Sequence, residues 1–499
     1  MLFTQLYFWV FFAIVLAGYS ILYKKKSIRY AYLFVVSLFF YWKTGGYFFT
    51  LLLFSTLVDY IIGLIIYKTR KEGVRKLMLA LSVTINLGVL AYFKYSYFFV
   101  DLINEGITFL RQYSIANFEY VDVVNVLAIW SNKLAGTNFD TGTIILPVGI
   151  SFFTFQTISY TVDVYRKKVE PVRNIIDFGF YVSFFPQLVA GPIVRAAEFI
   201  PQLYQKYKLT IREMGHAVFL ILSGLIKKVM ISDYISINFV DRVFDSPLSY
   251  SGFENLMAMY GYSVQIYCDF SGYTDIAIGV ALLLGIRLPI NFYSPYKAVN
   301  ITDFWRRWHI SLSSWLRDYL YISIGGNRKG VFRTYVNLLV TMVLGGLWHG
   351  ANIKFVIWGA LHGAALAIHK FWMKINPFKQ KKNKLTHFLA VSSTFHFVSF
   401  AWIFFRAENW DKAWQMIGQL IQPTEPEIMI EMINAYKFVF ILIALALIFH
   451  WLPSYWKEYY RGLFIKTPIW VKVFIVSFVV FVLYQVSSLD LQPFIYFRF

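Results

Sequence analysis

Two histidines are the first candidates for chemistry in this sequence, because each directly follows a tryptophan inside a strongly apolar part of the chain. They are His309, after Trp308, and His349, after Trp348. An ionisable side chain at membrane depth is costly, so a functional role is the first hypothesis for it. A neutral histidine can act as a general base and take the proton of a hydroxyl. For His349 the alternative is a core histidine hydrogen-bonded between helices.

The spacing of the two histidines predicts that the chain turns between them. They are 40 residues apart, and one straight helix of that length would span about 60 Å, roughly twice the hydrocarbon thickness of a bilayer. The sequence GGNRKG at 325–330 favours a turn and interrupts helices. We therefore expect a hairpin whose two arms carry the histidines at similar depth, which allows them to meet in one site.

Further polar residues near these histidines are candidates for the walls of a cavity. Carboxylates buried in the apolar stretch 267–275 need cationic partners, for which the arginines of 306–317 are available. A structural ion pair is the alternative to a cavity wall. For His309 the alternative is a polar residue on a buried amphipathic helix beside Arg306 and Arg307, and it is a stronger alternative than the one for His349. The candidates are Asp269, Ser271, Asp275, Arg306, Arg307, Arg317, Asn352 and His362, with Trp308 and Trp348.

The sequence does not predict a metal site. His362 and His369 are seven residues apart, which places them about 10 Å apart on one helix, too far to hold one ion. Neither of the two Trp-His pairs has a third histidine or cysteine nearby. The single cysteine, Cys268, excludes an internal disulfide and a cysteine metal cluster.

The composition indicates an all-helical, multi-pass membrane protein. The chain has 499 residues, of which 58% are hydrophobic, with a mean hydropathy of +0.55. The net charge of +20 does not require nucleic-acid binding, because the basic residues cluster in short loops as the positive-inside rule expects. The basic loops at 24–29 and 68–76 are expected in the cytoplasm, which places the N-terminus outside.

Apolar runs predict the order of the spans. We expect helices at 5–23, 28–42, 47–67, 77–100, 143–163, 174–192, 213–233, 254–285, 334–348, 352–373, 386–406, 435–453 and 469–488. The segment 101–140 is expected outside, with room for an interfacial helix. Prolines and a glycine break the run 174–192, and 303–323 is too charged to face lipid, so it is expected as one re-entrant or interfacial helix. We expect one membrane domain, with N-terminal helices at 1–142, core motifs at 143–373 and C-terminal helices at 374–499.

Five stretches in order carry a family resemblance: 146–166, 183–203, 267–279, 300–330 and 337–363. Through them the chain resembles the membrane-bound O-acyltransferases, and most of all the bacterial alginate and peptidoglycan O-acetyltransferases. The resemblance implies roughly 11–13 transmembrane or re-entrant helices around a central funnel or tunnel. The family's membrane histidine matches His349 in LWHG, which would act as general base, and its second histidine matches His309 in WHISLS. His309 could then orient the acyl group, donate to the oxyanion or share a proton relay.

The resemblance also implies the substrates and partners. The acyl group, acetyl in this branch, comes from a cytoplasmic thioester, either acetyl-CoA or, as in the D-alanyl branch, an acylated carrier protein. No permanently bound cofactor is implied. The group ends on a hydroxyl of an exported polymer, alginate-like exopolysaccharide or peptidoglycan. The resemblance places the protein among the lipids of the bacterial cytoplasmic (inner) membrane. It also implies a partner, a separate extracytoplasmic SGNH-hydrolase-like acetyltransferase.

Two alternatives remain at this stage. Phosphates of coenzyme A need cations, and Arg328, Lys329, Arg333 or the basic run 374–384 could supply them. Loops that only set topology would carry the same charges.

A transporter or conduit for the acyl group would also bury histidine, aspartate and arginine, although the paired interrupted repeats common in transporters are not visible.

Overall fold

All regular structure is helical in the residues that the computed structural model describes, which are 3–138, 140–189, 191–375 and 383–486. No strand occurs in these ranges. A helix pairs its own backbone N–H and C=O groups, as a hydrocarbon environment requires. Within the described ranges, six helices are long and apolar enough to cross a membrane, or up to eight if each of two bent pairs counts as one span. The all-helical membrane fold predicted from the sequence is confirmed.

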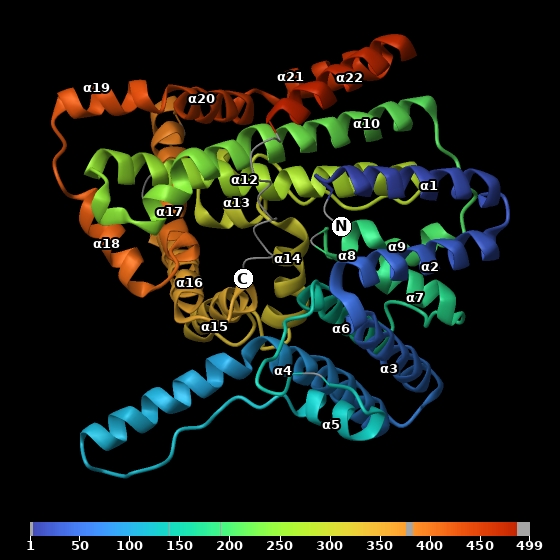
Figure 1. Cartoon of the computed structure of the whole chain (residues 1–499). Helices are drawn as coiled ribbons and strands as arrows, with labels where there is room; N and C mark the ends of the chain where they lie inside the picture. Colours follow the sequence, from blue (N-terminus) through green and yellow to red (C-terminus); the bar gives the residue numbers. More distant parts are fainter. Residues whose placement is uncertain (1–2, 139, 190, 376–382, 487–499) are drawn as a thin grey trace.

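The N-terminal helices form one side of the molecule. They are α1 (Leu6–Leu22), α2 (Lys26–Gly45), α3 (Phe49–Lys68), α4 (Glu72–Gln112) and α5 (Val126–Ala135). A 3-10 turn joins α2 to α3, so the two predicted spans form one helical run, Ile28–Lys68. With 41 residues, α4 is about twice as long as a single crossing needs and extends into the segment expected outside. Figure 1 shows α4 and α5 along the lower edge of the molecule.

The middle of the chain supplies the buried core. It contains α6 (Ile150–Tyr165), α7 (Ile175–Ser183), α8 (Phe185–Leu188), α9 (Ala196–Leu203), α10 (Ile211–Leu225), π-helical turns at Ile226–Asp233 and Ser236–Val240, α11 (Asp241–Asp245) and α12 (Gly252–Leu283). The helix α6 is buried on nearly all sides. It begins after Gly149, whose φ of +76° suits glycine and where a Cβ atom would lie 2.6 Å from the Leu188 carbonyl oxygen. The predicted break at 184–192 is present between α7 and α9.

The two Trp-His pairs lie on a helical hairpin, although its first arm differs from the prediction. This part contains α13 (Ile301–Trp305), α14 (Ile310–Trp315), a π-helical turn at Leu316–Tyr321, α15 (Val331–His349) and α16 (Ile353–Ile375). The prediction of one helix over 303–323 is wrong, because the chain is interrupted at His309, which has a φ of +43°. The predicted turn at 325–330 does precede α15. Close packing of α15 on α16 depends on Gly346, where a Cβ atom would lie 2.1 Å from the Phe355 carbonyl oxygen.

The C-terminal part of the chain consists of six helices. They are α17 (Lys384–Arg406), α18 (Trp410–Leu420), α19 (Pro426–Ala435), α20 (Lys437–Trp451), α21 (Ser454–Lys466) and α22 (Ile469–Val486). The chain bends by 83° between α19 and α20 and by 115° between α21 and α22. These four helices follow the upper edge of the molecule in Figure 1, with α12 to α16 between them and α4. Of the basic run at 374–384, residues 376–382 lie outside the described residues.

Candidate active site

The hairpin brings the two histidines against one indole ring. The centroid of the Trp348 ring is 6.4 Å from that of His309 and 5.1 Å from that of His349. Both histidine side chains are buried. The structure therefore gathers His309, Trp348 and His349 into one cluster, as the turn at 325–330 allows.

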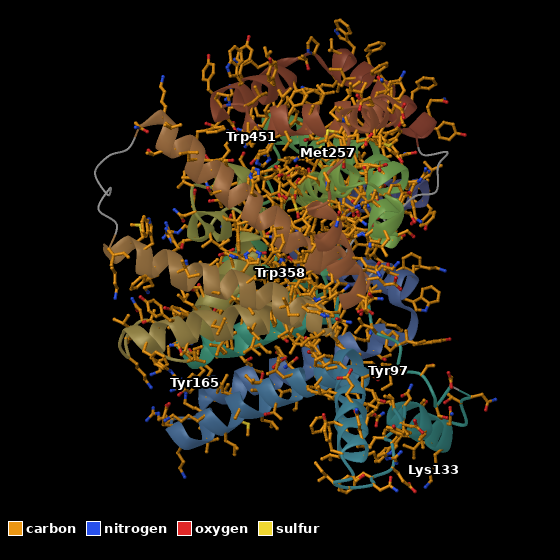
Figure 2. The ribbon with its side chains drawn as sticks, turned by 90° about the vertical axis from the view of Figure 1, so that its left-hand side faces the viewer. Tyr97, Lys133, Tyr165, Met257, Trp358 and Trp451 are labelled. Atoms are coloured by element: carbon orange, nitrogen blue, oxygen red, sulfur yellow. The ribbon has the colours of Figure 1, made fainter. Side chains whose placement is uncertain are left out.

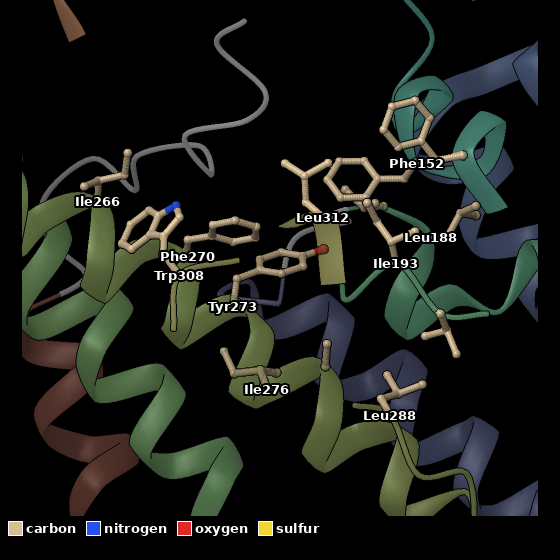
Figure 3. Close-up of a cluster of buried hydrophobic side chains, with 14 of the residues drawn as sticks. Phe152, Leu188, Ile193, Ile266, Phe270, Tyr273, Ile276, Leu288, Trp308 and Leu312 are labelled. Atoms are coloured by element: carbon tan, nitrogen blue, oxygen red, sulfur yellow. The ribbon is translucent and has the colours of Figure 1, made fainter. Parts of the chain in front are cut away.

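His309 occupies the joint between α13 and α14. Its Nδ1 atom lies 3.2 Å from Oδ1 of Asn291, and the ring of Phe270 on α12 meets its ring edge-on at 4.7 Å. Figure 3 shows the surrounding core, to which Phe270, Trp308 and Leu312 contribute. Sequence reasoning missed Asn291. The only signal was a lone amide in the loop between two motif-bearing segments.

His349 is the last residue of α15, and the N-terminal helix α4 binds that end. Lys94 of α4 donates from Nζ to the carbonyl oxygens of Trp348 at 2.6 Å and His349 at 3.0 Å. The Tyr95 hydroxyl donates to the Leu347 carbonyl at 2.9 Å. These are carbonyls that the end of a helix leaves without partners, and a cation there is favourable. Sequence reasoning missed this contact, although a lysine within the apolar run 77–100 was a signal.

Replacing Lys94 with methionine is expected to lower both stability and turnover. Methionine keeps much of the apolar stem but removes the two hydrogen bonds to the Trp348 and His349 carbonyls, which costs about 1–3 kcal/mol, and it frees the helix end that carries His349. Thermal melting and acyl-donor turnover of the purified protein measure the two effects. Lys43→Met, at an exposed lysine of α2, is the control. Equal melting and turnover for Lys94→Met and wild type would contradict the positioning role.

His362 lies on the far side of a second indole. The Trp358 ring of α16 is 5.2 Å from the His349 ring and 4.7 Å from the His362 ring, and Figure 2 shows Trp358 in the interior. His362 is fully buried, with Trp305 also against it at 5.2 Å. Neither of its ring nitrogens has a hydrogen-bond partner among the described residues. His369 lies seven residues further along α16, and its ring contacts the Thr302 hydroxyl at 2.9 Å instead.

The prediction that arginines pair with the carboxylates on α12 is wrong. Asp269 lies 2.5 Å from Nζ of Lys228, which also binds Asp233 at 2.7 Å. Asp275 is paired with Lys227 at 2.6 Å. Both lysines belong to the π-helical turn after α10, and sequence reasoning missed them.

Close contact between two glycines explains why the carboxylates pair with Lys227 and Lys228 and not with the arginines. On Gly224 of α10, a Cβ atom would lie 2.5 Å from the Gly272 carbonyl oxygen of α12, so the two backbones touch there. The arginines are engaged or exposed elsewhere. Arg307 binds Asp303 at 2.9 Å and Arg317 binds Asp318 at 2.7 Å, whereas Arg306 is exposed. Asp269 and Asp275 therefore hold α10 against α12.

Comparison with known proteins decides the family. Residues 171–407, which include both histidines, match the membrane-bound O-acyltransferase family. The chain is 37% identical over 447 residues to the peptidoglycan O-acetyltransferase of Helicobacter pylori, covering 84% of this chain and 79% of that protein. The chain belongs to the membrane-bound O-acyltransferase family. It is thus a multi-pass membrane O-acyltransferase of bacterial type, as predicted.

Two further relatives of this O-acyltransferase have names that specify different acyl groups. A probable alginate O-acetylase of Pseudomonas putida is 39% identical over 424 residues, covering 84% of this chain and 79% of that protein. A teichoic acid D-alanyltransferase of Bacillus subtilis is 32% identical over 279 residues, covering 52% of this chain and 68% of that protein. The similarity therefore extends across acyl groups of different kinds.

The remaining candidates in the O-acyltransferase lie apart from the histidine cluster or support the fold. Arg328, Lys329 and Arg333 are exposed around the hairpin turn, and α15 separates Arg333 from His349 by 16 residues, about 24 Å. Asn352 accepts the Lys354 backbone N–H at 3.0 Å and so caps the start of α16. Ser271 is buried on α12. Within the described ranges, no group of three or more His, Cys, Asp or Glu side chains is arranged as metal ligands would be.

Proposed function

We propose that this enzyme moves an acetyl group from a cytoplasmic thioester, acetyl-CoA, towards hydroxyls of an exported cell-surface polysaccharide, with His349 as general base. The observation that carries the proposal is the pair of buried histidines around Trp348 in a chain of this family. Relatives named for peptidoglycan and alginate acetylation support an acceptor of this class. Teichoic acid D-alanyltransferase supports the same direction of transfer to a surface polymer.

The chemistry needs one proton acceptor and a dry site. His349 takes the proton of the acceptor hydroxyl while that oxygen attacks the thioester carbonyl. The C–O bond forms, the C–S bond breaks, and the leaving thiolate takes the proton back from the imidazolium. The rings of Trp358 and Phe405, each 5.2 Å from the His349 ring, keep water from the thioester.

The arrangement of basic loops supports a cytoplasmic donor side. Loops at 68–76 and 164–173 and the turn at 325–330 are basic, so the positive-inside rule places them in the cytoplasm. Arg166 of the 164–173 loop donates to the Asp318 carbonyl and the Ser323 hydroxyl, both at 3.0 Å, and so joins this loop to the segment just before the turn. The acetyl group therefore leaves on the outer side, where an SGNH-hydrolase-like acetyltransferase completes its transfer.

The exposed cations of the hairpin turn are expected to bind the phosphates of the donor. Changing Arg328, Lys329 and Arg333 together to glutamine should raise KM for acetyl-CoA about tenfold or more and leave kcat unchanged, because charge-assisted bonds to phosphate are lost about 24 Å from His349. The steady-state kinetics of the purified enzyme measure this. Lys133→Gln on α5, at the edge of the molecule in Figure 2, is the matched control. An unchanged KM would assign these charges to topology alone.

An acylated carrier protein is the second donor to test, because the resemblance to the D-alanyl branch implies it. Purified enzyme supplied separately with acetyl-CoA and with an acetylated carrier protein distinguishes the two donors by thiol release. Release from acetyl-CoA supports the proposal. Release from the carrier protein alone replaces coenzyme A as donor but keeps the histidine site. Release from neither, in the presence of acceptor and partner, contradicts the thioester mechanism.

A further inference from the structure

Asn291 binds the start of α14 and the ring of His309 at the same time. Its backbone carbonyl accepts the Ile310 N–H at 2.9 Å. Its side-chain Oδ1 accepts the Ser311 backbone N–H at 3.1 Å and the Ser311 hydroxyl at 2.9 Å. The same Oδ1 atom faces His309 Nδ1 at 3.2 Å. Both Asn291 and His309 are buried.

These contacts determine the direction of the hydrogen bond to His309. An amide oxygen and nitrogen look alike in shape, but a backbone N–H can only donate. The atom facing the Ser311 N–H is therefore the oxygen of Asn291, which only accepts. His309 Nδ1 must then donate to it, so the neutral imidazole carries its proton on Nδ1 and its lone pair on Nε2.

We infer that Asn291 is a positioning residue that fixes His309 in the Nδ1–H tautomer, so that Nε2 acts as a proton acceptor. The inference rests on the proposed function, in which His309 belongs to the active site. A neutral His309 of this tautomer cannot donate from Nε2 to the oxyanion. Its role is to share the proton relay with His349, taking up the proton at Nε2 until it returns to the leaving sulfur.

The remaining atoms of Asn291 support a specific task. Its amide nitrogen has no hydrogen-bond partner among the described residues, and a buried unpaired donor costs about 1–3 kcal/mol. If the role of position 291 were purely structural, a side chain without this unpaired donor would be more stable there. The oxygen, in contrast, accepts three hydrogen bonds, one from His309 and two from Ser311.

The surroundings of His309 allow its protonation state to be measured. Phe270 and Trp348 place uncharged rings against His309, and His349 packs against the same Trp348 ring. A negative charge placed at 291 would stabilise the imidazolium directly. The base would then stay protonated to higher pH, and the acid limb of the rate profile would move upwards.

Two substitutions separate positioning from folding. Asn291→Leu removes the acceptor and is expected to lower kcat about 100-fold, within the range of a general base, with KM unchanged. Asn291→Asp keeps the acceptor and should retain more activity, with the acid limb shifted up by about one pH unit or more. Ser314→Ala, which removes a hydrogen bond to the Ser311 carbonyl but none to Asn291, is the control and should keep the wild-type pH profile. An unshifted profile in Asn291→Asp would overturn the inference.

A second readout does not need turnover. In protein labelled with ¹⁵N-histidine, the His309 signals, assigned by their loss in His309→Gln, should show a protonated Nδ1 and an unprotonated Nε2. Asn291→Leu should mix or reverse the two. A wild-type His309 protonated on Nε2 would overturn the inference. The expected tautomer in a protein that turns over no thioester would instead count against the proposed function alone.

Discussion

Changing His349 to alanine is expected to lower the release of free thiol from the acyl donor at least about 100-fold, with the protein still folded. A general base contributes about 10²–10⁴ to the rate, and buried His349 packs against the same Trp348 ring as His309. The ring packs against Trp358 and Phe405, so alanine leaves a small cavity without an unpaired charge. Thiol release by purified wild type and variant, at matched amounts of folded protein, gives the ratio.

Two further variants make this result specific. His396→Ala removes an exposed histidine from α17 and should keep full turnover. His349→Gln preserves much of the volume but not the proton affinity, so its turnover should be as low as that of His349→Ala. Equal release by wild type and His349→Ala would show that His349 is not the base. Activity retained in the glutamine variant alone would assign His349 to packing.

Changing Lys228 to methionine is expected to destabilise the fold by about 3–5 kcal/mol, the usual cost of removing one partner of a buried ion pair. Lys228 lies between Asp233 and Asp269, at 2.7 and 2.5 Å, and all three side chains are buried. Methionine would leave two carboxylates without a cation at the contact of α10 with α12. Thermal and denaturant unfolding in detergent measure the loss.

The neighbouring lysine provides the matched control. Lys227 pairs with Asp275, and both side chains are more exposed than the Lys228 group, so Lys227→Met should cost clearly less. Adding Asp233→Asn and Asp269→Asn to Lys228→Met should restore much of the stability, because the unpaired charges are removed. Equal losses for the two lysines, or no recovery in the triple variant, would refute the buried-charge explanation.

Much of the fold is readable from the sequence because burial in lipid demands long apolar helices. The predicted spans at 213–233, 254–285, 352–373 and 386–406 correspond to α10 with its π-helical turn, α12, α16 and α17. The interruption at His309 was not predicted, since composition alone does not show that Asn291 binds the start of α14. Likewise, the extent of α4 exceeds the apolar run that identified it.

The partners of the site residues depend on tertiary contacts that spacing does not reveal. The two Trp-His pairs and the turn between them were predictable, because a chain in a bilayer must turn within one thickness. Lys94 lies 255 residues from the His349 carbonyl that it binds. Asp269 pairs with Lys228 because glycines bring α10 and α12 together, and proximity in sequence to the arginines of 306–317 had no bearing on it.

The most direct test of the account measures acetyl esters on the surface polysaccharide of cells. A strain that lacks its own copy of this gene is complemented with wild type, His349→Ala or His396→Ala, at equal amounts of folded protein in the membrane. Ester content is then measured by mild alkaline release of acetate. The account predicts that wild type and His396→Ala restore the esters and that His349→Ala does not. Full restoration by His349→Ala would contradict the assignment of acyl transfer to this site.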